Sequence, residues 1–246
     1  MGLPTGIIAC LFDLDGVLTQ TATVHAQAWK QMFDEFLEAR KPLPGEPLAP
    51  FDEVRDYEEY VDGKPRADGV RSFLAARTIS LPEGSDEDSP DAETIHGLGH
   101  RKDQIFLQLI RAHGVKAYDG SVRYVQAARE AGLMLAVVSS SKNTSEVLRA
   151  AKLDGLFDGQ VDGNVAEAKH LKGKPAPDTY LEGARIVGAT AAASAVYEDA
   201  LAGVEAGRAG HFGLVVGVDR LGQADALRAH GADVVVADLA DLLRPV

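Results

Sequence analysis

The chain has 246 residues, enough for one large domain or two small ones with a sizeable hydrophobic core. Its hydrophobic and charged fractions, 46% and 25%, are ordinary for a globular protein. The net charge of −12 argues against nucleic acid and anionic membranes as partners, because both carry negative charge. No apolar run approaches the ~20 residues of a membrane span, and the N-terminus lacks the pattern of an export signal. We therefore expect a cytoplasmic protein without a membrane or nucleic-acid partner.

The first strongly apolar run, residues 7–12, predicts a buried strand that ends in two carboxylates. Asp13 and Asp15 follow it directly, and Gly16 then allows the chain to turn. Neighbouring carboxylates repel each other, and their burial is costly unless a cation or hydrogen-bond donors compensate. We interpret the pair as a phosphoryl-transfer site that uses Mg²⁺, with one carboxylate as nucleophile and the other as acid/base. Cys10, the only cysteine, excludes an internal disulfide and is expected in the core of this strand.

Residues 21–112 are predicted to form a helical insert without strands. Amphipathic patterns in this segment favour helices over residues 25–40, 52–61, 70–77 and 103–113. A proline-rich connector is expected over residues 42–50 and an acidic surface loop over residues 80–93. Residues 1–20 and 113–246 are then expected to form one domain, from which residues 21–112 protrude as a cap.

Beyond residue 115, short apolar runs alternate with amphipathic stretches. Strands are predicted over residues 133–138, 195–197, 214–218 and 234–236, and helices over residues 122–131, 145–151, 178–187, 201–209 and 224–230. This alternation predicts an α/β fold with a Rossmann-like parallel sheet core, helices on both faces, and the helical cap as an insertion. Such sheets bind ligands at the carboxyl ends of their strands.

Three further motifs lie at predicted strand ends or directly before helices. Ser139 ends the second strand, Lys174 stands in a Gly-Lys-Pro string, and Glu198 and Asp199 follow a third strand. Each has an ordinary explanation, since Ser139 and Asp199 could cap helices, and Lys174 and Glu198 could simply be solvated. Together at one sheet edge they favour a phosphate site, with Ser139 and Lys174 as ligands of the phosphate oxygens.

The same residues suggest how Mg²⁺ is held. We expect the carboxylate of Asp13, the backbone carbonyl of Asp15 and a carboxylate from Glu198 or Asp199 as its ligands. These four motifs, in this order, resemble those of the haloacid-dehalogenase superfamily over most of the chain. The resemblance supports Asp13 as the nucleophile that forms an aspartyl phosphate and Asp15 as the acid/base.

A finer resemblance, to the β-phosphoglucomutase-like subfamily, rests on a second set of residues. They are Thr21 and His25 in the string 19–29, Arg66 after a Gly-Lys-Pro turn, Lys102 in Arg-Lys-Asp, and Ser141, Lys142 and Asn143 after the phosphate-binding serine. The resemblance implies that Arg66 and the 141–143 string hold a second phosphate. It also implies that Lys102 and His25 hold sugar hydroxyls or steady Asp15.

The resemblance implies an isomerase that interconverts β-D-glucose 1-phosphate and glucose 6-phosphate through glucose 1,6-bisphosphate. Its partner would be a small phosphorylated sugar, its cofactor Mg²⁺ and its state a monomer.

Three alternatives to this function stay open. A sugar-phosphate phosphatase would let water attack the aspartyl phosphate. A signalling receiver module should be about half this length, with its aspartate on a middle strand. A non-catalytic binding module would have no need of intact Asp13, Asp15, Lys174 and Asp199. The 80–93 stretch is longer than its mutase counterpart, which leaves the exact sugar open.

Overall fold

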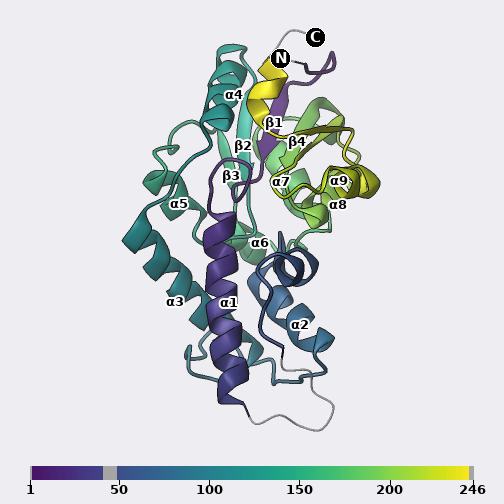
Figure 1. Cartoon of the computed structure of the whole chain (residues 1–246). Helices are drawn as coiled ribbons and strands as arrows, with labels where there is room; N and C mark the ends of the chain where they lie inside the picture. Colours follow the sequence, from purple (N-terminus) through teal and green to yellow (C-terminus); the bar gives the residue numbers. More distant parts are fainter. Residues whose placement is uncertain (1, 41–48, 244–246) are drawn as a thin grey trace. The chain divides into compact units, whose positions relative to one another are not determined.

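A computed structural model describes residues 2–40 and 49–243 of the chain (Figure 1). The chain divides into two compact units. The first, here called the core unit, consists of Met1–Gln20 and Val115–Val246, and the second, the helical unit, of Thr21–Gly114. Most of the predicted proline-rich connector over residues 42–50 lies outside the described residues.

The core unit is built on a six-stranded parallel sheet in the order β3-β2-β1-β4-β5-β6. Its strands are β1 (Ala9–Phe12), β2 (Met134–Val138), β3 (Gly159–Val161), β4 (Ser194–Glu198), β5 (Leu214–Val218) and β6 (Val234–Val236). The strand order changes direction between β1 and β4. Doubly wound sheets bind ligands at this point, outside the carboxyl ends of the strands. The predicted Rossmann-like fold is confirmed.

Helices cover both faces of this sheet. One face packs against α7 (Asp178–Ile186), α8 (Leu201–Ala209) and α9 (Ala224–His230), and its buried core includes Leu11 and Val196. The opposite face packs against α4 (Asp119–Glu130), where the rings of Phe12 and Tyr197 stack at 4.5 Å. Cys10 lies on this second face, and burial raises the pKa of its thiol to about 11. As predicted, Cys10 is a core residue.

Two short elements of the core unit escaped prediction. Strand β3 contains only Gly159, Gln160 and Val161, so it has neither an apolar run nor an alternating pattern. Helix α6 (Gly163–Ala168), which follows it, buries none of its residues and shows no amphipathic signal. Helix α5 (Thr144–Ala150), in contrast, lies within one residue of the predicted bounds.

The helical unit contains α1 (Ala22–Ala39), a π-helical turn (Tyr57–Val61), α2 (Arg66–Ala76) and α3 (Ile95–His113), with no strand among its described residues. Helix α3 begins well before the predicted start at residue 103, because two glycines obscure its pattern. Gly97 is required by close packing, since a Cβ there would lie 2.3 Å from the carbonyl oxygen of Ala92. None of the described helices is both long and apolar enough to cross a membrane.

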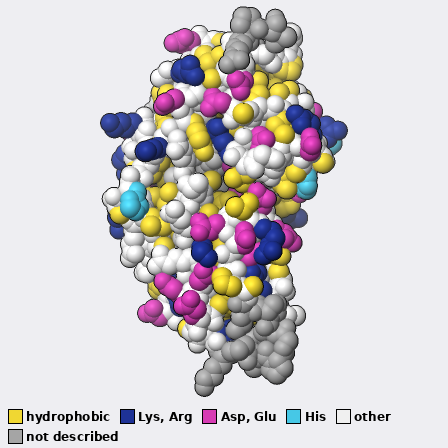
Figure 2. Space-filling view, in the orientation of Figure 1, with side chains coloured by type: hydrophobic (Ala, Val, Ile, Leu, Met, Phe, Trp, Pro, Cys, Tyr) yellow, Lys and Arg dark blue, Asp and Glu magenta, His cyan; other side chains and the backbone are white. Residues whose placement is uncertain are grey.

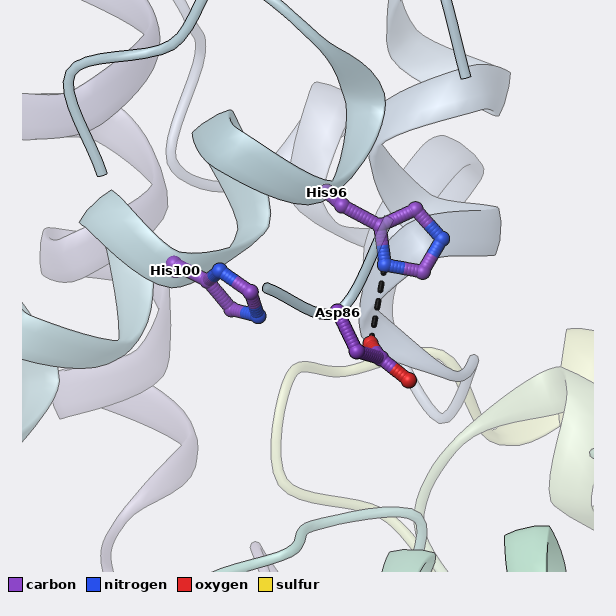
Figure 3. Close-up of side chains that lie close together, drawn as sticks. All are labelled: Asp86, His96 and His100. Atoms are coloured by element: carbon purple, nitrogen blue, oxygen red, sulfur yellow. Dashed lines mark hydrogen bonds and ion pairs between the residues drawn. The ribbon is translucent and has the colours of Figure 1, made fainter. Parts of the chain in front are cut away.

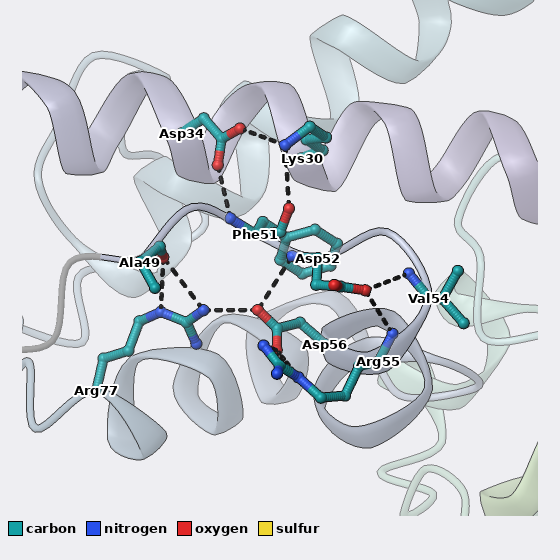
Figure 4. Close-up of polar contacts among 9 residues, drawn as sticks. All are labelled: Lys30, Asp34, Ala49, Phe51, Asp52, Val54, Arg55, Asp56 and Arg77. Carbon is teal, nitrogen blue, oxygen red and sulfur yellow. Dashed lines mark hydrogen bonds and ion pairs between the residues drawn. The ribbon is translucent and has the colours of Figure 1, made fainter.

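Aromatic rings and one buried ion pair hold the helical unit together. Phe33 stacks on Phe73 at 3.7 Å, and Arg77 lies over the ring of Phe73. Arg77 donates to Asp56 at 2.6 Å (Figure 4), and their side chains are only 6% and 2% exposed. Burial alone would raise the pKa of Asp56. The backbone N–H of Asp52 and the guanidinium of Arg77 are among the donors to its carboxylate, and these donors hold the pKa below its usual value. The stabilisation from this pair is therefore present at neutral pH and lost on acidification.

The surface of the chain mixes charges of both signs. Figure 2 shows acidic and basic side chains interspersed on the visible face. Ion pairs account for part of this mixture, such as Lys30 with Asp34 on α1 and Arg228 with Asp225 on α9. Exposed pairs of this kind contribute little to stability, so the buried contacts above determine the fold.

Asp56→Asn should lower the free energy of unfolding by about 3–5 kcal/mol, because it leaves the buried Arg77 guanidinium without a counter-charge. Urea unfolding followed through Trp29, the only tryptophan, reports on the helical unit directly. Arg55→Ala is the matched control, since its 70% exposed side chain also pairs with Asp56 and should cost less than about 1 kcal/mol. Equal losses in the two variants would contradict a dominant role for the buried pair.

Candidate active site

Three of the predicted site residues lie at the carboxyl edge of the sheet. The backbone N–H of Asp13, after β1, donates to the carbonyl of Tyr197 on β4 at 2.9 Å. Ser139 follows β2, and its N–H donates to the carbonyl of Val161 on β3 at 2.9 Å. Glu198 is the last residue of β4. The parallel register thus aligns the ends of four adjacent strands where the strand order reverses.

Lys174 joins two of these strands through its ammonium group. It lies in the loop before α7 and is only 3% exposed. Its Nζ donates to Asp13 Oδ1 at 2.6 Å and to Glu198 Oε1, and lies 3.3 Å from the carbonyl oxygen of Val138. The result is a buried cation held between two buried carboxylates.

Glu198 is fully buried and held by donors on both oxygens. Besides Lys174, its Oε1 accepts from the hydroxyl of Tyr180 at 3.0 Å, and its Oε2 accepts from the N–H of Ala200 at 3.0 Å. A Cβ at Gly203 would lie 1.8 Å from Oε1, so only glycine fits on this turn of α8. Glu198 therefore fixes the position of Lys174.

Asp199 completes an acidic cluster with Asp13 and Glu198. One carboxylate oxygen from each lies within 4.8 Å of the others, and all three residues are buried. Gly16, at φ +89°, brings the loop after Asp15 against this cluster, since a Cβ there would lie 1.7 Å from Asp199 Oδ2. Hard oxygen donors this close together suit Mg²⁺, so the residues present fit the predicted cofactor.

The electrostatics of the cluster also favour a further cation. Burial raises the pKa of Asp13 well above its usual range; Lys174 opposes this, while Glu198 and Asp15 add to it. For Lys174, burial acts to lower the pKa, but Asp13 and Glu198 outweigh it and raise the pKa. The lysine stays charged, yet one ammonium faces several carboxylates. A divalent cation would relieve this imbalance.

Two residues of this edge were not predicted. Tyr180, on the first turn of α7, lies with its ring 4.8 Å from the Lys174 ammonium and bonds to Glu198. Arg220 donates through Nε to the carbonyl of Gly16 at 2.8 Å and stacks on Tyr118. Arg220 closely follows the carboxyl end of β5. Its place at this edge could therefore have been predicted from the sequence in the same way as that of Asp13.

The predicted string after Ser139 forms a tight turn. The Ser139 hydroxyl oxygen accepts from the N–H of Ser141 at 3.1 Å, and the Ser141 hydroxyl oxygen accepts from the N–H of Asn143 at 3.1 Å. Lys142 pairs with Glu167 on α6 at 2.8 Å and is 40% exposed. The structure therefore orders Ser141 and Asn143 around Ser139 but directs Lys142 to a surface partner.

The remaining predicted residues lie in the helical unit. Thr21 is buried directly before α1. The His25 ring stacks on Phe106 at 3.9 Å and accepts a short hydrogen bond from the buried Lys102. Arg66 pairs with Asp103, the neighbour of Lys102 on α3, at 2.7 Å. The structure thus groups these four around α1 and α3, with both cations already partnered.

The family model of haloacid dehalogenase-like hydrolases matches residues 7–211, and the chain belongs to this family. It is 54% identical over 246 residues to proteins from Mycobacterium bovis and Mycobacterium tuberculosis named β-phosphoglucomutase, covering 99% of this chain and 94% of theirs. It is 32% identical to the Bacillus subtilis protein of that name, covering 95% and 91%. The predicted family is confirmed.

Solved structures show the same fold. The crystal structure of a β-phosphoglucomutase from Clostridium difficile superposes with a TM-score of 0.75 at 23% identity, covering 96% of this chain and 93% of that chain. A hydrolase from Pseudomonas syringae gives the same TM-score at 24% identity, covering 96% of both chains. Because these matches cover 96% of this chain, the shared fold includes both of its units.

Lys174→Met should lower the free energy of unfolding by about 3–5 kcal/mol, because it leaves Asp13 and Glu198 buried without their ammonium. Phosphate release from acetyl phosphate should also fall to background. Lys142→Met is the control, since its exposed pair with Glu167 should contribute no more than about 1 kcal/mol. Thermal unfolding and phosphate release are measured on both variants. If Lys142→Met lowered stability and activity as much as Lys174→Met, the role of Lys174 as the buried counter-charge of Asp13 and Glu198 would be refuted.

Proposed function

We propose that the chain interconverts β-D-glucose 1-phosphate and glucose 6-phosphate through glucose 1,6-bisphosphate, with Mg²⁺ as cofactor. The observation that carries the proposal is the 54% identity, over nearly the full length of both chains, with proteins named β-phosphoglucomutase. The arrangement of Asp13, Lys174 and Glu198 supports it, because it supplies a nucleophile and a fixed cation at the sheet edge.

The reaction is a double transfer in which Asp13 carries the phosphoryl group. A free hydroxyl of the sugar phosphate attacks phosphorus on phosphorylated Asp13; the new P–O bond forms as the bond to Asp13 breaks, and Asp15 accepts the hydroxyl proton. The bisphosphate then returns its other phosphoryl group to Asp13, and Asp15 gives the proton to the departing sugar oxygen. No water is consumed, so the net reaction is an isomerisation.

Each neighbour of Asp13 has a defined part in this transfer. Lys174 holds the phosphoryl oxygens by charge, and Ser139 with the N–H groups of its turn adds hydrogen bonds. Mg²⁺, held by Asp13, the Asp15 carbonyl and Asp199 or Glu198, would neutralise charge on those oxygens. Because Glu198 already accepts three hydrogen bonds, we favour Asp199 for the metal and Glu198 for positioning Lys174.

The bisphosphate has a second phosphate, which the enzyme must also hold. We assign it to Arg66 with Ser141, Lys142 and Asn143, and the sugar hydroxyls to Lys102 and His25, with Thr21 beside them. The arginine fork suits a phosphate because it can donate two parallel hydrogen bonds. The ion pair of Arg66 with Asp103 supports this assignment, since it holds the guanidinium in a defined position. We further propose that the protein acts in the cytoplasm as a monomer.

A phosphatase is the second candidate, favoured by the hydrolase family that the chain matches. In it, water rather than a sugar hydroxyl would attack phosphorylated Asp13. Incubation with Mg²⁺, β-glucose 1-phosphate and a trace of glucose 1,6-bisphosphate separates the two. We expect glucose 6-phosphate to accumulate much faster than inorganic phosphate. Stoichiometric phosphate release without glucose 6-phosphate would establish the phosphatase.

Asp13→Asn should abolish both sugar isomerisation and phosphate release while the fold is kept, because it removes the nucleophile at almost constant volume. Asp15→Asn should still form phosphoenzyme from acetyl phosphate, but transfer to the sugar should slow by about 10²–10⁴-fold, as expected on loss of general acid–base catalysis. Phosphoenzyme trapping and coupled glucose 6-phosphate detection measure the two steps. Near-normal turnover in Asp13→Asn would refute the mechanism.

Arg66→Ala tests the mutase assignment. Loss of a charge-assisted phosphate contact, worth about 1.5–3 kcal/mol, should reduce isomerisation about ten- to a hundredfold. Hydrolysis of acetyl phosphate requires no second phosphate and should be nearly unchanged. Arg71→Ala is the matched control on α2, because its exposed side chain pairs with Asp68 and Glu83. Asp103→Asn shows the effect of losing the ion pair alone.

The ratio of the two activities decides the outcome for Arg66. A fall in isomerisation alone, absent from Arg71→Ala and small in Asp103→Asn, would support phosphate binding. An equal fall of both activities would assign Arg66 to the structure of the helical unit. No change in either activity would favour the phosphatase.

A further inference from the structure

A second group of potential metal ligands lies in the helical unit. Asp86, in the acidic loop before α3, lies beside His96 and His100 on that helix (Figure 3). One ligand atom from each lies within 4.8 Å of the others. The two histidines are four residues apart, so they project from the same face of α3. Two imidazoles and a carboxylate so placed can surround one ion.

The hydrogen bond of His100 suits this role. His100 Nδ1 lies 2.8 Å from the backbone carbonyl oxygen of Asp88, and only an N–H at Nδ1 can donate to it. This leaves the lone pair of His100 Nε2 for a metal. Histidine ligands characteristically donate their other ring N–H to a carbonyl or carboxylate in this way. The ring of His96 faces Asp86, with Nδ1 2.9 Å from Oδ1.

The loop that carries Asp86 is held against the start of α3. Thr94 caps the helix by accepting from the N–H of Gly97 at 2.9 Å, and its hydroxyl donates to Asp88 at 2.5 Å. Arg101 donates to the carbonyl of Pro90 at 2.9 Å. The backbone around all three side chains is therefore fixed by contacts that involve no metal, which lowers the ordering cost of binding an ion.

We propose that Asp86, His96 and His100 form a binding site for a divalent transition metal of the zinc type. Two nitrogen ligands and one carboxylate oxygen leave a fourth tetrahedral position for water. Mg²⁺ prefers oxygen ligands in octahedral geometry, so this site discriminates against the cofactor proposed for Asp13. Glu83, whose Oε1 lies 3.6 Å from His96 Nε2, adds to the attraction for a cation.

The site links the acidic loop to α3, which carries Lys102 and Asp103 further along. A bound ion would join Asp86 to the first turns of the helix and stabilise both. Because all three ligands are partly or fully exposed, the ion can enter from solvent without unfolding of the unit. This site is independent of the proposed isomerase function, since none of its ligands takes part in phosphoryl transfer.

The test measures Zn²⁺ binding to the full chain, previously dialysed against a chelator, with saturating Mg²⁺ to occupy the acidic cluster around Asp13. Competition with a chromophoric chelator should give one Zn²⁺ per chain at this site. His96→Gln and His100→Gln should each weaken binding about ten- to a hundredfold. Co²⁺ should give an intense visible absorption band typical of tetrahedral nitrogen and oxygen ligation, and each variant should lose it.

His113→Gln is the matched control, because this histidine lies in the last turn of the same helix. It should bind Zn²⁺ like the parent, and unchanged melting without metal should show that all three variants fold. Binding that is unaffected by His96→Gln and His100→Gln would overturn the proposal, as would equal weakening in His113→Gln. If Asp13→Asn were the only variant to lose Zn²⁺ binding, the ion would belong to the acidic cluster around Asp13, and the proposal would also be overturned.

Discussion

The buried ammonium of Lys174 is the contact on which the candidate active site depends. It joins Asp13, after β1, to Glu198, at the end of β4, where the order of the sheet reverses. Without it, two carboxylates would face each other in the protein interior, and one would have to accept a proton. Lys174 opposes the rise in the pKa of Asp13 that burial and the neighbouring carboxylates cause, so it favours the anion that the proposed nucleophilic role requires.

The residues around Lys174 hold its ammonium group in a fixed position. Tyr180 lies beneath the ammonium and bonds to Glu198, which also accepts from the N–H of Ala200. Helices α7 and α8 are thus tied to the same carboxylate. A fixed cation of this kind stabilises charge in a transition state without having to reorganise. Because Glu198 already accepts three hydrogen bonds, the proposed metal role falls to its neighbour Asp199.

The sequence could place these residues at one sheet edge because chain direction alone aligns the ends of parallel strands. Asp13, Ser139 and Glu198 each follow an apolar run, so the sheet edge could be inferred without knowing a distance. Strand β3 could not be inferred, since Gly159 and Gln160 carry no apolar signal and its pairing with β2 is a long-range contact. The same limit applies to His25 and Lys102, which are far apart in the chain and meet only through folding.

Partnered cations in the helical unit bear on how a phosphate could be recognised there. Arg66 is held by Asp103, and Lys102 by His25. An arginine that already has a carboxylate partner loses little side-chain entropy when a phosphate arrives, because its rotamer is fixed beforehand. The guanidinium has five N–H donors, so one carboxylate does not exhaust them. The carboxylate of Asp103 repels any incoming anion, and a dianion more than a monoanion. A phosphate can therefore bind at Arg66 only if its contacts with the remaining N–H donors outweigh that repulsion.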